Sequence, residues 1–242
     1  MQFEKARCLI DELDVDPGVK SDMILAFRRR ISVSDIFFFR EPFTPISMTG
    51  TRCFFKCKHC NTHYLRHMLD GSAGKFQEKA RYLAQKGEKG ILLSGGSEAD
   101  GSVPTYLFAD SIMELKKSTG LKISAHTGIV DGLKAQVLSG YLDMALVDVT
   151  GDDDTIQNVL GLDACVKDYE ETLDNLSSAG ISLAPHIIVG LHYGRLKGEW
   201  KALELVRKFK PEVLVIVVFI PTKGTAMEGI RPPAVGDVIK VI

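Results

Sequence analysis

The stretch Thr51-Arg52-Cys53-Phe54-Phe55-Lys56-Cys57-Lys58-His59-Cys60-Asn61 carries three cysteines in the spacing C-x3-C-x2-C. Three thiolates on one short loop can hold three corners of a cubane iron–sulfur cluster and leave the fourth iron without a protein ligand. A bare iron is a place where a small molecule can bind and react. The spacing therefore predicts catalytic chemistry at Cys53, Cys57 and Cys60, beyond the storage of electrons.

Two other uses of this cysteine triplet remain open from the sequence. A structural zinc site needs a fourth ligand, and because no second cysteine pair exists, His59 or His63 would have to supply it. A thioredoxin-like redox pair at Cys57 and Cys60 would leave Cys53 without a role. An iron–sulfur cluster is the interpretation that gives all three thiolates a role without a further ligand.

The two other cysteines, Cys8 and Cys165, stand alone in the sequence. Each is typical of a small buried side chain, and both are candidate ligands for a second cluster shared with a partner. Five cysteines, three of them clustered, argue against a disulfide framework and favour a reducing compartment.

Length and charge narrow the classes of protein. The chain has 242 residues, with 30 basic against 31 acidic side chains and no block of like charge, so we expect neither a nucleic-acid groove nor a membrane surface. The longest apolar stretch, 213–221, is too short to span a bilayer. The acidic N-terminus does not read as a secretory signal, and a cytoplasmic location is expected.

From residue 46 onward, short apolar runs alternate with amphipathic stretches of helical length, a pattern typical of successive β-α units. We count six units and predict an α/β fold with a parallel sheet, as a partial (β/α)6 TIM-type barrel. An N-terminal helical extension over 1–43, interrupted at Pro17-Gly18, would precede a core domain over 44–242. The predicted strands are Pro45–Met48, Gly90–Ser94, Lys122–Ala125, Met144–Val149, Leu183–Val189 and Glu212–Phe219, and the predicted helices are His63–Gln85, Val103–Ser118, Val130–Ser139, Cys165–Ala179 and Lys197–Phe209. Left-handed helix caps are expected at Gly87, Gly120, Gly140 and Gly180.

Unusual polar residues follow the predicted strands one after another. Because parallel strands bring their carboxyl ends to one edge, we expect these residues to gather there. In chain order they are the cysteine loop, Gly95-Gly96-Ser97-Glu98, His126, Asp148, Gly190-Leu191-His192 and Pro221-Thr222.

A three-cysteine loop after the first strand, with a glycine pair and an acid after the second, resembles the radical S-adenosylmethionine (SAM) superfamily over about residues 44–225. The resemblance implies a partial (β/α)6 barrel and a [4Fe–4S] cluster held by Cys53, Cys57 and Cys60. It also implies that the open iron chelates the amino and carboxylate groups of SAM, whose cleavage yields a 5′-deoxyadenosyl radical.

The resemblance also implies which residues bind SAM. For each of them a simpler structural interpretation remains open. In the family the glycine run ends in Gly-Gly-Glu and meets the methionyl amino group; here a serine is inserted, so either Ser97 or Glu98 could do so after Gly95-Gly96. The simpler reading of this run is a strand-to-loop turn. His59 takes the position of an aromatic residue near adenine, or it is a solvated loop histidine.

Further candidate positions lie at or after the third, fourth and fifth predicted strands. Asp148 could bind ribose hydroxyls or cap the next helix. The stretch Pro185–His192, with His186, Val189 and Gly190, resembles a strand region whose backbone reads adenine. His126, in Ala125-His126-Thr127-Gly128, is assigned to the same cofactor site. His186 or His192 could shuttle a proton or bind substrate, or simply pack. The run 151–154 lacks the alternating acids of a calcium loop, and capping by one of its aspartates is favoured.

Longer runs refine the resemblance to the biotin-synthase-like branch, and within it to a subunit of the two-component lipoyl synthase of archaea and some bacteria. The runs are Thr49–Cys53 with Lys58–Asn61, Leu93–Glu98 with Gly101–Pro104, Ala125–Gly128, Val147–Asp152, Pro185-His186 with Gly190–His192, and Phe219–Thr225. This resemblance implies sulfur insertion at unactivated carbons of a protein-bound octanoyl chain.

The partners implied are a second radical SAM subunit, a lipoyl or octanoyl carrier protein, and an electron donor such as ferredoxin or flavodoxin. Sulfur insertion usually draws on a second cluster, for which this chain offers only Cys8 and Cys165. The chain ends at Val241-Ile242, soon after Pro232-Pro233, where related sequences are expected to continue, and a missing C-terminal segment could hold further ligands. The alternatives are a radical enzyme of another cofactor pathway and a non-catalytic iron–sulfur partner subunit.

Overall fold

The computed structural model describes residues 7, 10, 11, 16–30 and 43–242. Cys8 and much of the predicted N-terminal extension therefore lie outside the described residues. The chain divides into two compact units, one over Phe43–Pro233 and one formed by Met1–Pro42 together with Ala234–Ile242. The predicted boundary between residues 43 and 44 stays a prediction.

The smaller unit contains helices α2 (Pro17–Arg30) and α9 (Val235–Val241). α2 begins at Pro17, which suits the first position of a helix because proline has no N–H to offer and a pre-set φ. Pro17-Gly18, predicted as a break between two helices, is thus where α2 starts.

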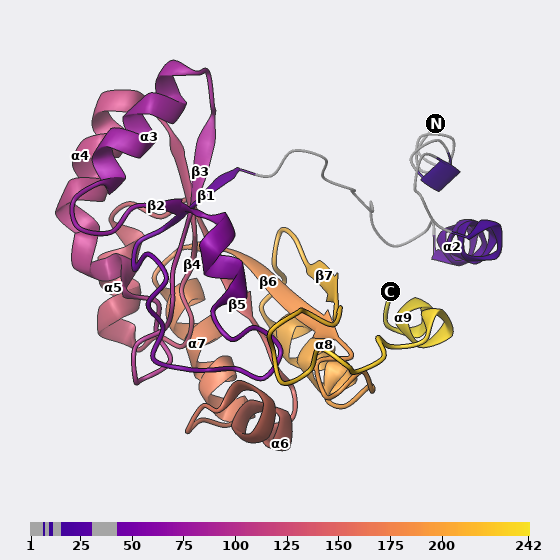
Figure 1. The fold of residues 1–242 in the computed structure, drawn as a ribbon. Helices are drawn as coiled ribbons and strands as arrows, with labels where there is room; N and C mark the ends of the chain where they lie inside the picture. The colour runs from indigo at the N-terminus through magenta and orange to yellow at the C-terminus, as the bar shows by residue number, and fades with distance from the viewer. Residues whose placement is uncertain (1–6, 8–9, 12–15, 31–42) are drawn as a thin grey trace. The chain divides into compact units, whose positions relative to one another are not determined.

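The larger unit is built on one parallel sheet, which confirms the predicted α/β partial barrel. Its strands lie in the order β2-β1-β3-β4-β5-β6-β7, so that β1 and β3 to β7 follow the sequence (Figure 1). The bounds are β1 Thr44–Ser47, β2 Leu69–Asp70, β3 Gly90–Ser94, β4 Lys122–His126, β5 Met144–Asp148, β6 Ser182–Val189 and β7 Val215–Val218.

Helices connect the successive strands and lie along one face of the sheet, because right-handed crossovers that advance in one direction place every helix on the same side. The helices are α3 Phe76–Gln85, α4 Ala109–Thr119, α5 Gly132–Ser139, α7 Val166–Ser178 and α8 Glu199–Lys208. Shorter turns are η1 His63–His67, η2 Pro104–Phe108, α6 Asp153–Thr155 and the π-helical η3 Ile156–Leu160. Among the described residues, no helix is long and apolar enough to cross a bilayer.

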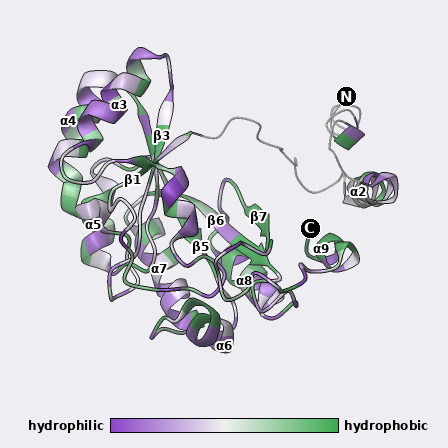
Figure 2. Cartoon of the chain, viewed as in Figure 1, coloured by the Kyte–Doolittle hydropathy of each residue, from purple (hydrophilic) through white to green (hydrophobic). Residues whose placement is uncertain are grey.

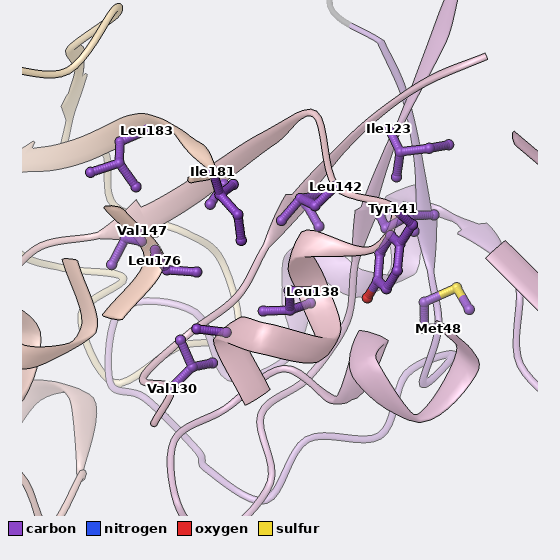
Figure 3. Close-up of a cluster of buried hydrophobic side chains, with 14 of the residues drawn as sticks. Met48, Ile123, Val130, Leu138, Tyr141, Leu142, Val147, Leu176, Ile181 and Leu183 are labelled. Carbon is purple, nitrogen blue, oxygen red and sulfur yellow. The ribbon is translucent and has the colours of Figure 1, made fainter. Parts of the chain in front are cut away.

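The main hydrophobic core lies between the helices and the sheet. Alternate strand residues such as Ile123 and Val147 are buried there, beside Leu138 and Tyr141 from the α5 region (Figure 3). Figure 2 shows the matching pattern: the strands are mostly hydrophobic, whereas the helices carry one polar side. Burial of this surface, at roughly 25 cal/mol per Å², is the main force that holds the sheet and helices together.

Two predictions about the elements are wrong. The predicted helix His63–Gln85 is instead η1, the two-residue strand β2 and α3, because residues 71–75 form a turn between β2 and α3. Gly140 caps α5 with a φ of −67°, a right-handed conformation. The other three cap predictions are confirmed, since Gly87, Gly120 and Gly180 have φ of 91°, 70° and 76°.

Candidate active site

The strands present a second face, opposite the helices, which we call the inner face. Side chains alternate between the faces of a strand, and the fully buried residues of β3 to β6 face the helices. The inner face therefore carries the residues between them. These are the exposed Asp148 and the partly exposed Leu92, Ser124, His126, Met144, Leu146, His186 and Ile188.

The cysteine loop begins just after β1, at the carboxyl edge of the sheet. Tight turns wind it: the N–H of Cys60 donates to the carbonyl of Cys57 at 3.1 Å, and that of His63 donates to Cys60 at 2.8 Å. Directly after Cys60 the chain is left-handed, with φ of 45° at Asn61 and 63° at Thr62. A β-branched residue in this region costs about 1–3 kcal/mol, so the surrounding contacts must impose the turn.

The glycine loop after β3 packs directly on the cysteine loop. A Cβ at Gly96 would lie 2.0 Å from the carbonyl oxygen of Arg52 and 2.5 Å from Cα of Cys53. The N–H of Phe54 donates to the carbonyl of Ser97 at 2.9 Å. The glycine pair predicted from sequence thus allows two backbones to touch, which a side chain at position 96 would prevent.

Thr49 joins the two loops, a role that the sequence did not reveal. Its hydroxyl accepts a hydrogen bond from the N–H of Gly96 at 2.7 Å and donates to the carbonyl of Arg52 at 2.8 Å. The run Thr49-Gly50-Thr51 carried the resemblance but gave no sign of this contact, because the partner lies 47 residues away.

The far side of the cysteine loop is held by η3 and by the segment after β7. The N–H of Lys58 donates to the carbonyl of Val159 at 2.8 Å, and the N–H of Met227 donates to the carbonyl of Lys58 at 3.2 Å. The side-chain amide of Asn61 donates to the carbonyl of Gly224 at 3.1 Å. The loop is therefore anchored on both flanks.

The three thiols are close enough to influence one another. Burial, with the charges of Cys60 and Cys53, raises the pKa of Cys57 to about 12, and burial also raises the pKa of Cys60. Binding of metal must therefore displace protons and provide the positive charge that the site lacks.

The spacing of the thiols tests which metal group they suit. Within the described part of the chain, no three ligand atoms that all lie within 4.8 Å of one another include a cysteine sulfur. A single zinc ion, with Zn–S bonds of about 2.3 Å, would need its sulfurs closer than this. A cubane binds each thiolate on a different iron and holds them further apart, so the spacing excludes a zinc ion bound by all three thiolates and leaves the cluster as the metal group that can use them.

Four other predicted residues come together at the same edge. His126 ends β4, Asp148 ends β5 and lies opposite His186 of β6, and the ring centroids of the two histidines are 5.5 Å apart. Burial lowers the pKa of His59 to about 4, although the charge of Asp148 acts in the opposite direction. This coupling places His59, beside Cys60, near the carboxylate of Asp148.

The remaining predicted residues differ in what they offer. The side chain of Glu98 is exposed, while Ser97 is partly buried and uses its carbonyl to bind Phe54. The carbonyl of Val189 accepts from Phe219 at 2.9 Å, and the N–H of Gly190 donates to Glu199 at 2.8 Å. Both backbone groups therefore already form hydrogen bonds within the chain. The predicted role of Val189 and Gly190 toward adenine stays a prediction.

The acidic run 151–154 supplies a helix cap, as favoured from sequence. Asp152 accepts from both the N–H and the hydroxyl of Thr155, at 2.8 Å and 2.6 Å, at the start of α6. The alternative cap by Asp148 is not seen. His192 lies nearby, with its Nδ1 3.0 Å from the hydroxyl of Thr155.

Glu199 supports the turn after β6 and was not predicted. Its side chain is 4% exposed, and its two oxygens accept from the N–H groups of Gly190 and Lys197 at 2.8 Å and 2.6 Å. Replacing Glu199 with alanine should lower the free energy of unfolding by about 2–3 kcal/mol, because one buried and one half-buried N–H group lose a charged acceptor.

Urea denaturation measures this loss, and Glu204→Ala is the matched control on the same helix. Glu204 is exposed and pairs only with Lys201 at 3.9 Å, so its replacement should change the free energy by less than about 0.5 kcal/mol. Equal effects of the two variants would show that the buried carboxylate does not hold the turn.

Together the fold and the loops define an α/β protein with a candidate iron–sulfur site at the carboxyl edge of its sheet. The family model described as "Radical SAM superfamily" matches residues 47–221. The chain belongs to the radical SAM superfamily, whose cofactors are a [4Fe–4S] cluster and SAM.

Solved structures share the fold at low sequence identity. Methylornithine synthase (PylB) matches with a TM-score of 0.66 and 16% identity, over 97% of this chain and 71% of that one. The hydrogenase maturase HydG from Carboxydothermus hydrogenoformans matches with a TM-score of 0.68 and 16% identity, over 98% and 57%. SuiB from Streptococcus suis, bound to SAM, matches with a TM-score of 0.59 and 14% identity, over 95% and 53%. The chain thus spans from about half to 71% of these proteins. No curated protein sequence matched it.

Proposed function

We propose that the chain is a radical SAM enzyme in which Cys53, Cys57 and Cys60 hold the cluster and Gly95–Glu98 receives the methionyl end of SAM. The observation that carries this proposal is the direct contact between the two loops, with Gly96 against Arg52 and Cys53. A ligand held by the cysteine loop would meet the glycine loop at once.

When bound, the cluster supplies the electron that splits SAM into methionine and a 5′-deoxyadenosyl radical, which takes hydrogen from a substrate. This chain's residues orient the participants. The glycine loop offers backbone groups to the methionyl end, and His59, neutral because burial lowers its pKa, offers a flat uncharged ring to adenine. Anchoring by Val159 and Met227 keeps the cysteine loop in place.

The test is anaerobic reconstitution with iron and sulfide, followed by dithionite and SAM. We expect 5′-deoxyadenosine to accumulate, as measured by liquid chromatography with mass spectrometry. Protein that holds a full cluster and forms no more 5′-deoxyadenosine than a cluster-free sample would refute the proposed activity, and would favour a non-catalytic iron–sulfur subunit.

For the substrate, we propose a protein-bound octanoyl chain that receives sulfur, as in lipoyl synthesis. The inner face supports an aliphatic substrate, since it carries Leu92, Met144 and Leu146 below the edge where the cysteine loop lies. Ile188 and Cys57 pack against one apolar cluster formed by Val159, Leu160, Leu191, Phe219 and Met227, so apolar surface continues to the thiols.

The sulfur is proposed to come from a second radical SAM subunit. Cys165 is half-buried at the start of α7, where no other cysteine accompanies it among the described residues, and Cys8 lies outside them. The electron donor is proposed to be a small acidic protein such as a ferredoxin or flavodoxin, because Arg52 and Lys56 are exposed on the cysteine loop.

Octanoylated carrier protein, incubated with the enzyme, SAM, reductant and each candidate partner, tests this substrate. Mass spectrometry should show hydrogen replaced by sulfur on the octanoyl group, and only with the partner present. Formation of 5′-deoxyadenosine without any change in the octanoyl group would point to the alternative, a radical enzyme of another cofactor pathway.

A further inference from the structure

His126, Asp148 and His186 form a cluster that the cysteine and glycine loops do not need. They come from three neighbouring strands, and one ligand atom from each lies within 4.8 Å of the other two. Two imidazoles and one carboxylate are a common set for zinc and for non-haem iron(II), which keep further coordination positions open.

The three side chains do not satisfy one another. Within the described residues, Asp148 forms no hydrogen bond or ion pair with either histidine, and the buried Nδ1 of His126 has no partner. Ligand atoms around one ion with bonds of about 2.1 Å lie roughly 3–4 Å apart. The three ligand atoms all lie within 4.8 Å of one another and are therefore close enough to share one ion.

His186 is prepared as a ligand by its backbone. Its Nδ1 lies 3.1 Å from the carbonyl of Ala184, to which only a protonated nitrogen can donate, so Nε2 keeps its lone pair.

We propose that His126, Asp148 and His186 bind one divalent transition-metal ion, zinc or iron(II), separate from the iron–sulfur cluster. The ion lies on the inner face at the carboxyl edge of the sheet, the edge where the cysteine loop begins. Its open coordination positions suit an oxygen or sulfur donor. The proposal does not depend on which substrate the enzyme uses.

A second group of the same composition provides the control. Asp152, Asp154 and His192 also bring ligand atoms within 4.8 Å. Here, however, the ammonium group of Lys197 contacts both carboxylates, at 3.5 Å for Asp152. Its positive charge already neutralises these carboxylates and would repel a metal ion, so we expect no ion there.

The experiment uses full-length protein with its cluster assembled, stripped of loose metal and dialysed anaerobically against zinc chloride. We expect one zinc per chain beyond the four irons in the wild type and in His192→Gln. In His126→Gln and His186→Gln the zinc affinity should fall at least about 100-fold, since even outer-shell partners contribute about 10–100-fold.

Iron content and circular dichroism, measured on the same samples, separate loss of the ion from loss of the cluster or of the fold. Affinity for SAM is measured in parallel. Absence of extra zinc in the wild type, or zinc binding that persists in both histidine variants, would overturn the proposal. Variants that weaken SAM while the wild type takes up no zinc would return these residues to the nucleoside site.

Discussion

Replacement of Cys57 with alanine should remove the bound iron and abolish 5′-deoxyadenosine formation while the sheet stays folded. Three thiolates are needed to leave only one iron bare, and the loss of one leaves a cluster with two protein ligands. The main core lies on the opposite face of the sheet, among residues such as Ile123 and Val147, and does not contact the loop. We expect a loss of stability of about 1 kcal/mol, the usual size for a single substitution.

Iron and sulfide analysis, far-ultraviolet circular dichroism and urea unfolding measure the three parts of this prediction. Cys165→Ala is the matched control: the residue is half-buried, and the hydrogen bond from its N–H to Asp168 at 2.7 Å does not involve the sulfur. It should keep its iron. A full cluster in Cys57→Ala would contradict the ligand assignment, and loss of iron in Cys165→Ala would reveal a second cluster.

Replacement of Gly96 with alanine should reduce 5′-deoxyadenosine formation by at least about 100-fold. The added Cβ would meet the Arg52 carbonyl at 2.0 Å and Cβ of Cys53 at 2.5 Å. Backbone stands on both sides of this contact, so the loops must separate by about 1 Å, and a displacement of that size costs about 100-fold in rate.

Two comparisons isolate the cause of this loss. Gly132 lies in the first turn of α5, and a Cβ added there would lie 3.5 Å from Asn175, an ordinary contact distance. Gly132→Ala should therefore leave activity unchanged. Thr49→Val keeps the shape beside Gly96 but removes the hydrogen bond at 2.7 Å, and should give a smaller defect than Gly96→Ala. Full activity in Gly96→Ala would mean that the two loops need not touch.

The sequence predicted the fold well where the signal is local. β3 has the predicted bounds Gly90–Ser94, because a buried apolar run stops at a glycine pair. β2 could not be predicted, since Leu69 and Asp70 are exposed and form a strand only through pairing with Ile46 and Ser47. The split of the region 63–85 had a signal in Gly71 and Gly74, which the helical pattern on either side outweighed.

For the candidate site, spacing and strand order brought the predicted residues to one edge. The cysteine and glycine loops touch as expected, and the fit of Gly96 is what two glycines after a strand allow. Thr49 and Glu199 were missed because their roles depend on backbone donors contributed by other loops. The meeting of His126 with His186 likewise needs the sheet register, which no local pattern contains.

The sheet ends at β2 on one side and at β7 on the other, and between these ends the described chain is joined by loops instead of strands. Tyr64 bonds Thr222 at 2.8 Å, and Asn61 and Lys58 bond Gly224 and Met227. Parting this seam would leave the ladder of the sheet intact, because it breaks only side-chain and turn bonds, which are individually weak. The same separation would remove two anchors of the cysteine loop, so access from this side and the hold on the three thiols are linked.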